Sequence, residues 1–226
     1  MDASLWIAKT GLDAQQTRMS VIANNLANVN THGFKRDRAL FEDLLYQNIK
    51  QPGGQQSVDT QSPTGLMVGT GTRVVATEKT HTQGNLITTG NALDLAVQGE
   101  GFFQIQMADG TIAYTRDGGF KISSTGQVVT SNGSLLIPNI TLPANVATLT
   151  IGRDGTISAE LSNGGGAQTL GQIQVARFLN PAGLQAMGQN LMRETPASGP
   201  PQLQVPGEAG SAVSYTHLTL PTNREV

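Results

Sequence analysis

A heptad-spaced apolar stripe near the N-terminus constrains the fold of this chain more than any other feature. Its positions alternate between spacings of three and four residues, which keeps one face of an α-helix apolar over several turns. Gln15 interrupts the stripe once, and Gly11 costs about 1 kcal/mol relative to alanine in a helix interior. The stripe predicts a long helix whose narrow seam packs against another helix. The predicted seam residues are Leu5, Ala8, Leu12, Met19, Ile22, Leu26 and Val29.

The rest of the sequence offers no obvious partner for this helix. Asn28, Thr31 and Gly33 predict its end, and Gly33 suits a left-handed C-terminal turn. The best other apolar stripe lies in residues 37–50, is only about three turns long, and fits an irregular arm equally well. The seam can dock on the chain's own β-rich part or on other copies. We expect self-assembly or a missing C-terminal partner helix, because no comparable second heptad run exists.

Short apolar or alternating runs recur from about residue 66 to residue 191 and predict β-strands. Asp-Gly and Asn-Gly pairs separate many of these runs, and such pairs accept the positive φ of tight hairpin turns. Asp109, Asp117 and Asp154 each precede glycine, so we interpret them as turn residues rather than calcium ligands. The predicted fold is mainly β with a long N-terminal α-helix. It combines an antiparallel sandwich or barrel-like domain with a coiled-coil-forming helix.

Composition excludes several classes of function. The formal net charge is −2, which gives no electrostatic basis for binding nucleic acid or an anionic membrane. The chain has no cysteine, so disulfides, thiol catalysis and cysteine zinc sites are excluded. The first 30 residues do not resemble a Sec-type signal peptide, and no apolar run is long enough to predict membrane insertion. Charged residues make up 13%, and residues 122–152 contain none, which suits a subunit packed on several sides.

No catalytic, metal or cofactor motif stands out. The sequence lacks the His-Glu-x-x-His, phosphate-loop and dinucleotide patterns. The three histidines, His32, His81 and His217, lie in a predicted turn, a polar connector and the C-terminal tail. We therefore expect no enzymatic activity, no cofactor and no metal.

The segment after the seam carries a specific motif. The run from Val21 to Lys35, VIANNLANVNTHGFK, resembles the N-terminal signature of bacterial flagellar rod and hook proteins. Further matching motifs occur in the same order along the chain, from residue 4 to about 210, and favour the distal-rod type. The segment 35–63 also resembles the rod type, because hook subunits lack a comparable stretch. The motif residues are Asn24, Asn25, Leu26, Ala27, Asn28, Thr31, Gly33, Phe34 and Lys35.

This resemblance implies an axial structural protein whose copies stack helically into a hollow shaft between basal body and hook. Its implied partners are other copies of itself, proximal-rod and hook subunits, the surrounding ring proteins and the flagellar export apparatus. It implies a location in the rod that crosses the periplasm, reached without a cleaved signal peptide. A C-terminal heptad helix pairs with the N-terminal helix in that family. The alternatives are a proximal-rod or hook subunit, or a β-rich module that binds cell-wall glycan.

The C-terminal tail departs from the family pattern. Residues 211–226 show neither heptads nor clean alternation where the family has a strand and a long helix. The tail resembles translated adapter sequence at the end of a truncated reading frame, and a divergent natural terminus is the alternative. We expect five segments along the chain. They are a rod helix at 1–33, a rod-type connecting segment at 34–65, a β-rich domain at 66–195, a Pro/Gly linker at 196–210 and a non-native tail at 211–226.

Overall fold

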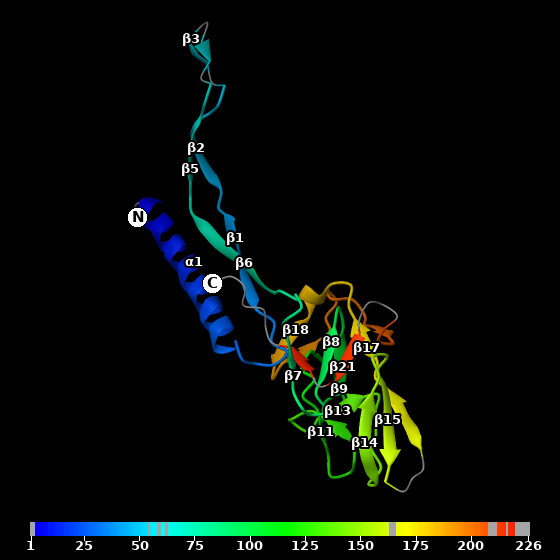
Figure 1. The fold of residues 1–226 in the computed structure, drawn as a ribbon. Coiled ribbons are helices and arrows are strands. Elements are labelled where there is room, and N and C mark those ends of the chain that lie inside the picture. Colours follow the sequence, from blue (N-terminus) through cyan, green and yellow to red (C-terminus); the bar gives the residue numbers. More distant parts are fainter. Residues whose placement is uncertain are drawn as a thin grey trace. The chain divides into compact units, whose positions relative to one another are not determined.

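The computed structural model describes residues 3–53, 55–57, 60–61, 63–162, 166–207, 212–215 and 217–219. The chain divides into two compact units. Unit 1 comprises residues 1–27 and 37–79, and unit 2 comprises residues 28–36 and 80–226. The predicted combination of one N-terminal helix with antiparallel β-sheets is confirmed (Figure 1). The strand at 72–79 belongs to unit 1 rather than to the β-rich domain in which the sequence placed it.

Unit 1 is a long helix beside a long β-hairpin (Figure 1). Helix α1 spans Ala3–Ala27. The hairpin, residues 37–79, is called the arm below. Its strands pair antiparallel, β1 with β6, β2 with β5 and β3 with β4. Their bounds are β1 Asp37–Asp43, β2 Tyr46–Lys50, β3 Gln55–Ser57, β4 Thr60–Gln61, β5 Leu66–Gly69 and β6 Thr72–Lys79.

The arm corrects the interpretation of residues 37–50 as a short helical stripe or an irregular arm. These residues form strands β1 and β2, because complementary residues about 30 to 40 positions downstream pair with them. The ion pairs Asp37–Lys79, at 2.9 Å, and Glu42–Arg73, at 3.0 Å, cross between β1 and β6. A bulge between Leu40 and Phe41 breaks the two-residue alternation. Because of this bulge, the sequence of β1 does not show the alternation that is typical of a strand.

Unit 2 contains the antiparallel sheets. The largest has nine strands, ordered β11-β12-β13-β9-β10-β19-β18, with β17 pairing both β9 and β20. A second sheet has the order β14-β15-β16, while β8 pairs with β21 and β7 with β22. The bounds are β7 Leu86–Thr88, β8 Leu95–Gln98, β9 Phe102–Gln106, β10 Ile112–Thr115, β11 Lys121–Ile122, β12 Val128–Val129, β13 Leu135–Ile137, β14 Val146–Ile151, β15 Thr156–Leu161, β16 Ala167–Gln172, β17 Val175–Arg177, the 3-10 turn η1 Pro181–Gly183, β18 Gln185–Gly188, β19 Leu191–Arg193, β20 Gln202–Gln204, β21 Ala212–Tyr215 and β22 His217–Thr219.

Three of the predicted hairpin turns, at Asp109-Gly110, Asn132-Gly133 and Asp154-Gly155, join paired strands in unit 2. The pair Asp117-Gly118 does not join paired strands, and Asn163-Gly164 lies outside the described residues. The carboxylates of Asp109 and Asp154 each accept hydrogen bonds from the backbone N–H and the hydroxyl of the threonine two residues on. These bonds lower the pKa of both carboxyl groups. The glycine after each aspartate has φ near +80°, at +81° and +77°. Both aspartates are therefore turn residues, as the sequence predicted.

The core of unit 2 is formed by inward-facing residues of these strands. Phe103 and Phe120 stack edge to face, with ring centroids 5.2 Å apart, among buried aliphatic side chains. A second cluster places the Phe178 ring against the rings of Phe102 and Tyr114. Two strands in residues 212–219 lie in the tail that the sequence marked as non-native. Only their backbone pairing is described.

Candidate assembly surface

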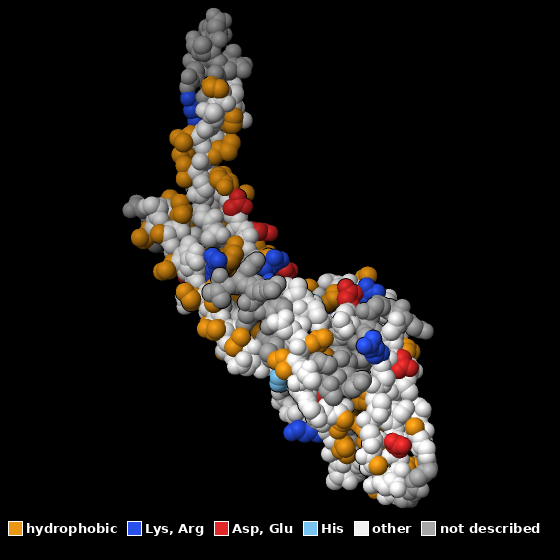
Figure 2. Space-filling view, viewed as in Figure 1, with side chains coloured by type: hydrophobic (Ala, Val, Ile, Leu, Met, Phe, Trp, Pro, Cys, Tyr) orange, Lys and Arg blue, Asp and Glu red, His pale blue; other side chains and the backbone are white. Residues whose placement is uncertain are grey.

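The seam residues of α1 are exposed on the surface of the chain. Burying a large apolar side chain in a core normally stabilises a protein by about 1.5–3 kcal/mol. An exposed row of such side chains therefore marks an interaction surface. Figure 2 shows apolar side chains gathered over α1 and over the arm. The exposed fractions are 65% for Leu5, 69% for Leu12, 67% for Met19, 46% for Ile22 and 66% for Leu26, and Ala8 is also exposed.

The helix packs on the arm with a different face. On this face Ala14 is buried, and Ile7, Thr10 and Val21 are half-buried. The Thr10 hydroxyl accepts a hydrogen bond from the backbone N–H of Thr72, at 3.4 Å. A side chain at Gly71 would meet the same hydroxyl, because an added Cβ would lie 2.2 Å from its oxygen. Packing with this face leaves the large apolar residues of the seam uncovered.

The helix ends earlier than the seam predicted. Helix α1 stops at Ala27, and Val29 lies half-buried in the turn that follows. The Thr31 hydroxyl donates to the Asn28 side-chain oxygen, at 3.1 Å, and the Thr31 N–H donates to the Asn28 carbonyl. These bonds compete with continued helix, as Asn and Thr side chains often do. Val29 is therefore not part of the exposed helical row.

The motif residues at the end of the helix hold the arm. Asn25 forms a pair of hydrogen bonds with the backbone of Asp37, each 2.9 Å long. The Asn24 amide lies 3.5 Å from the Asp37 carboxylate. These bonds join the last turn of α1 to the first residue of β1. Asn25 therefore satisfies both backbone hydrogen-bonding groups of Asp37.

The remaining motif residues hold the link segment, residues 28–36, against the rest of unit 2. Gly33 has φ +71°, as predicted for a left-handed turn, and an added Cβ would lie 2.6 Å from the backbone nitrogen of Asp117. The His32 carbonyl accepts a hydrogen bond from the Asn190 side chain, at 2.9 Å. Phe34 is half-buried, and its N–H donates to the Thr31 carbonyl. Only glycine fits so close to a neighbouring backbone with this φ.

Lys35 in the link segment and Arg116, which follows β10, are two buried cations that repel each other. The Lys35 ammonium donates to the Thr82 carbonyl, at 2.6 Å, and burial lowers its pKa to about 8, with a further contribution from the Arg116 charge. Arg116 lies 5.1 Å from the Phe102 ring centroid and donates to the Val97 carbonyl, at 3.3 Å. Burial also lowers the pKa of Arg116, to about 10. Lys35 and Arg116 both lie in motifs that carry the family resemblance, but no sequence pattern predicts that these two cations meet in the fold.

The burial of Lys35 predicts a pH-dependent stability. Folded Lys35 loses its proton near pH 8 and an unfolded lysine near pH 10.5. Between these pH values the unfolded state binds more protons than the folded state. The contribution of Lys35 to the free energy of unfolding therefore rises with pH from about 8 to 10.5. We expect the wild type to gain on the order of 3 kcal/mol relative to Lys35→Met between pH 8 and 10.5. Denaturant titrations at several pH values measure this. The exposed Lys121→Met variant serves as control, and an equal pH profile for wild type and Lys35→Met would contradict the assignment.

Comparisons with known proteins agree with this arrangement. Residues 5–35 match the family model described as Flagella basal body rod protein, which covers α1 and most of the link segment. Residues 96–159 match the model described as Flagellar hook protein FlgE/F/G D1 domain. The flagellar basal-body rod protein FlgG of Buchnera aphidicola subsp. Acyrthosiphon pisum is 51% identical over 215 residues, 95% of this chain and 83% of the relative. The chain belongs to the FlgG family of flagellar basal-body rod proteins.

Comparison with two proteins of Caulobacter vibrioides shows that this chain is more similar to FlgG than to the related FlgF. The chain is 45% identical to FlgG of Caulobacter vibrioides over 97% of the chain and 84% of the relative. It is 33% identical to FlgF of the same organism over 88% of the chain and 76% of the relative. The greater similarity to FlgG confirms the predicted resemblance at the level of the subunit type. These relatives give no support to the glycan-binding alternative.

Among the residues that the structure describes, no group of three or more histidine, aspartate or glutamate side chains lies close enough to hold a metal ion. No helix there has the length and hydropathy needed to cross a membrane.

Proposed function

We propose that this FlgG-family chain is a structural subunit of the flagellar distal rod. Copies polymerise helically into the drive shaft that links the basal body to the hook. The observation that carries this function is the seam on α1. Its large apolar residues are exposed on the single chain, because the helix packs on the arm with another face. A chain with such a row buries these side chains by associating with other chains rather than within its own fold.

The seam and the motif have separate tasks in this proposal. The seam residues Leu5, Leu12, Met19, Ile22 and Leu26 pack against another helix, since a heptad row suits knobs-into-holes packing. Asn24 and Asn25 fix the arm to α1, and Gly33 and Lys35 fix the link segment to unit 2. A repeated contact between two different surfaces does not close on itself, so it generates an open tube.

The remaining partners follow from the family. We propose contacts with proximal-rod subunits at one end of the distal rod, with hook subunits at the other end, and with ring proteins around it. The flagellar export apparatus would deliver the chain to the rod tip without a cleaved signal peptide. A neutral surface, such as the uncharged stretch 122–152, suits a shaft that turns inside a ring. The proposal assigns no catalytic role to any residue.

Complementation tests the proposed function. The full-length protein that contains this chain is expressed in a flagellated bacterium whose own distal-rod gene is deleted. We expect isolated basal bodies to regain a rod of normal length and the cells to swim. Basal bodies that stop at the proximal rod, with the protein exported and folded, would contradict the distal-rod assignment.

A further inference from the structure

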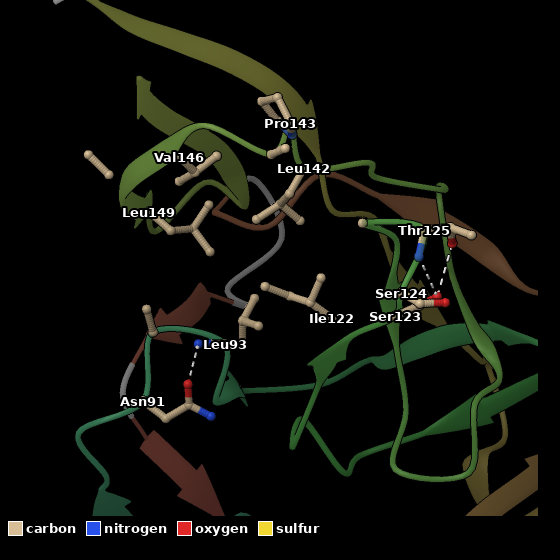
Figure 3. Close-up of a pocket in the computed structure, with 14 residues that line it drawn as sticks. Asn91, Leu93, Ile122, Ser123, Ser124, Thr125, Leu142, Pro143, Val146 and Leu149 are labelled. Atoms are coloured by element: carbon tan, nitrogen blue, oxygen red, sulfur yellow. Dashed lines mark hydrogen bonds between the residues drawn. The ribbon is translucent and has the colours of Figure 1, made fainter. Parts of the chain in front are cut away.

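A groove in unit 2 is lined by apolar and neutral polar side chains alone. Its volume is about 660 Å³, and none of its lining residues is charged. Figure 3 shows the three segments that form it, residues 91–93, 122–126 and 142–149. Ile122 is 52% exposed, so an apolar part of the groove is open to a partner. The other large apolar residues that line the groove are Leu93, Leu142, Pro143, Val146 and Leu149.

One wall of the groove is the free edge of a sheet. Strand β14 is the first in the order of the three-stranded sheet, and among the described residues it pairs with β15 alone. Its residues Val146, Ala147 and Leu149 line the groove. Natural edge strands usually carry charges or lie under a covering element, because their unpaired backbone groups otherwise pair with a further strand. No residue of β14 is charged, so its edge is suited to accept such a strand.

Unit 2 has a second free edge with matching properties. Strand β18 is the last in the order of the nine-stranded sheet, and among the described residues it pairs with β19 alone. All four residues of β18 are exposed, and Met187 is 43% exposed. Leu179, in the loop that leads through η1 to β18, is 90% exposed. Residues 178–192 contain no charge, so β18 offers an apolar and uncharged edge.

We propose that β18 of one copy adds to β14 of a second copy and fills the groove beside it. The inference rests on the proposed function, because it names one contact within the polymer. Strand addition pairs the backbone groups of the two free edges, and the groove receives the exposed side chains of the added strand. Both surfaces are uncharged, so neither loses the hydration of a charge when they meet.

Other edges of unit 2 fit the groove less well. Strand β20 pairs with β17 alone among the described residues, but Pro201 precedes it and Pro206 follows it closely, and proline protects an edge from further pairing. Strand β16 is uncharged, but its exposed residues are alanine, threonine and glutamine. The next charge along the chain from β18 is Arg193 on β19. Its guanidinium donates to the Gln185 side chain, at 2.8 Å, which keeps this charge over the β18–β19 pair.

The position of the two edges accounts for an open polymer. Figure 1 labels β18 at one end of unit 2 and β14 toward the other end. Each copy therefore offers one surface of each kind, and the edge of β18 lies apart from the groove of its own copy. A contact between two different surfaces is heterologous, and when it does not close into a ring it extends without limit. This contact involves unit 2 alone and is separate from the helix seam, which lies in unit 1.

Cross-linking tests the contact directly, because the chain has no cysteine. The full-length double variant Met187→Cys/Ile122→Cys is assembled into rods, and isolated basal bodies are treated with a short bismaleimide. We expect more than half of the protein to shift from monomer to a ladder of dimers and larger products. The matched control is Met187→Cys/Leu203→Cys, because Leu203 is 53% exposed on β20 in the same unit but outside the groove. We expect the control to remain monomeric.

The two single variants show whether the contact joins different surfaces. Rods made of Met187→Cys alone or of Ile122→Cys alone should give no dimers, because each contact then holds one thiol. Rods in which the two single variants are co-assembled should give dimers and no larger products. Dimers from either single variant alone would contradict a contact between β18 and the groove.

Two further results would overturn the proposal. A cross-link confined to single chains would place β18 on the groove of its own copy, and the absence of any ladder in intact rods would exclude the contact. If the double cysteine variant does not assemble, a charge pair decides the question. Ile122→Lys and Met187→Asp should each lower the amount of protein in isolated basal bodies at least tenfold, and the combined variant should recover it. Failure of the combined variant would overturn the contact, whereas failure of the wild type to form rods would contradict the proposed function.

Discussion

A single aspartate in the seam, at Leu12 or Ile22, is expected to abolish rod assembly and leave unit 2 folded. Both side chains are exposed in the single chain, at 69% and 46%, so the substitution removes little buried contact from the monomer. In the polymer the same position would place a carboxylate between packed helices. Burying an unpaired charge costs several kcal/mol, and every copy along the rod would carry that cost.

The measurement combines assembly with folding. Basal bodies from cells expressing Leu12→Asp or Ile22→Asp should lack the distal rod, with swimming reduced to background, while the thermal unfolding of the purified variants matches the wild type. Ser20→Asp is the control, because Ser20 is exposed on another face of α1 and its hydroxyl bonds only the Gln16 carbonyl. Normal flagellation in the Leu12→Asp strain would contradict the seam assignment.

Gly33→Ala is expected to detach the link segment from unit 2. A left-handed backbone at a non-glycine residue costs about 1–2 kcal/mol, and the new methyl group would also lie 2.6 Å from the Asp117 nitrogen and 2.8 Å from the Arg116 carbonyl carbon. These neighbours are backbone atoms and cannot rotate away. We therefore expect a total destabilisation of about 3 kcal/mol for the link segment.

Hydrogen exchange can measure this local effect. The Phe34 amide, which bonds the Thr31 carbonyl, should exchange on the order of 100-fold faster in Gly33→Ala. Gly53→Ala is a matched control, because Gly53 has a similar φ of +77° but nothing within 4 Å of an added Cβ. The control variant is therefore destabilised by the backbone strain alone. Equal exchange at Phe34 in Gly33→Ala and wild type would show that the close approach to Asp117 does not hold the link.

Local patterns predicted the elements whose partners lie nearby in sequence. The heptad spacing predicted α1, and the Asp-Gly turns predicted hairpins such as β9–β10 and β14–β15, because a tight turn fixes which residues meet. The motif glycine Gly33 was also predicted to adopt a left-handed turn, which the structure has. The expected function as a rod subunit came from motifs that the family comparisons then confirmed.

Long-range pairing was the part that the sequence could not predict. The arm depends on β1 meeting β6, and the bulge at Leu40 removes the alternation that would have shown a strand. The end of α1 was placed too late, because Val29 continues the spacing although Asn28 and Thr31 already bond each other. The contacts of Arg116 could not be predicted for a related reason. They involve Lys35, Phe102 and Val97, which meet it only after folding.

Methionine oxidation measures directly whether the seam is covered in the rod. Met19 is 67% exposed in the seam, whereas Met192 is 5% exposed in the core of unit 2 and serves as the internal reference. Dilute peroxide converts an exposed methionine to its sulfoxide, and mass spectrometry reports the rate at each site. Packing of the seam predicts that Met19 oxidises at least tenfold more slowly in assembled rods than in the monomer, with Met192 slow in both. Equal rates for Met19 in rods and monomers would show that the seam remains open to solvent and does not hold the subunits together.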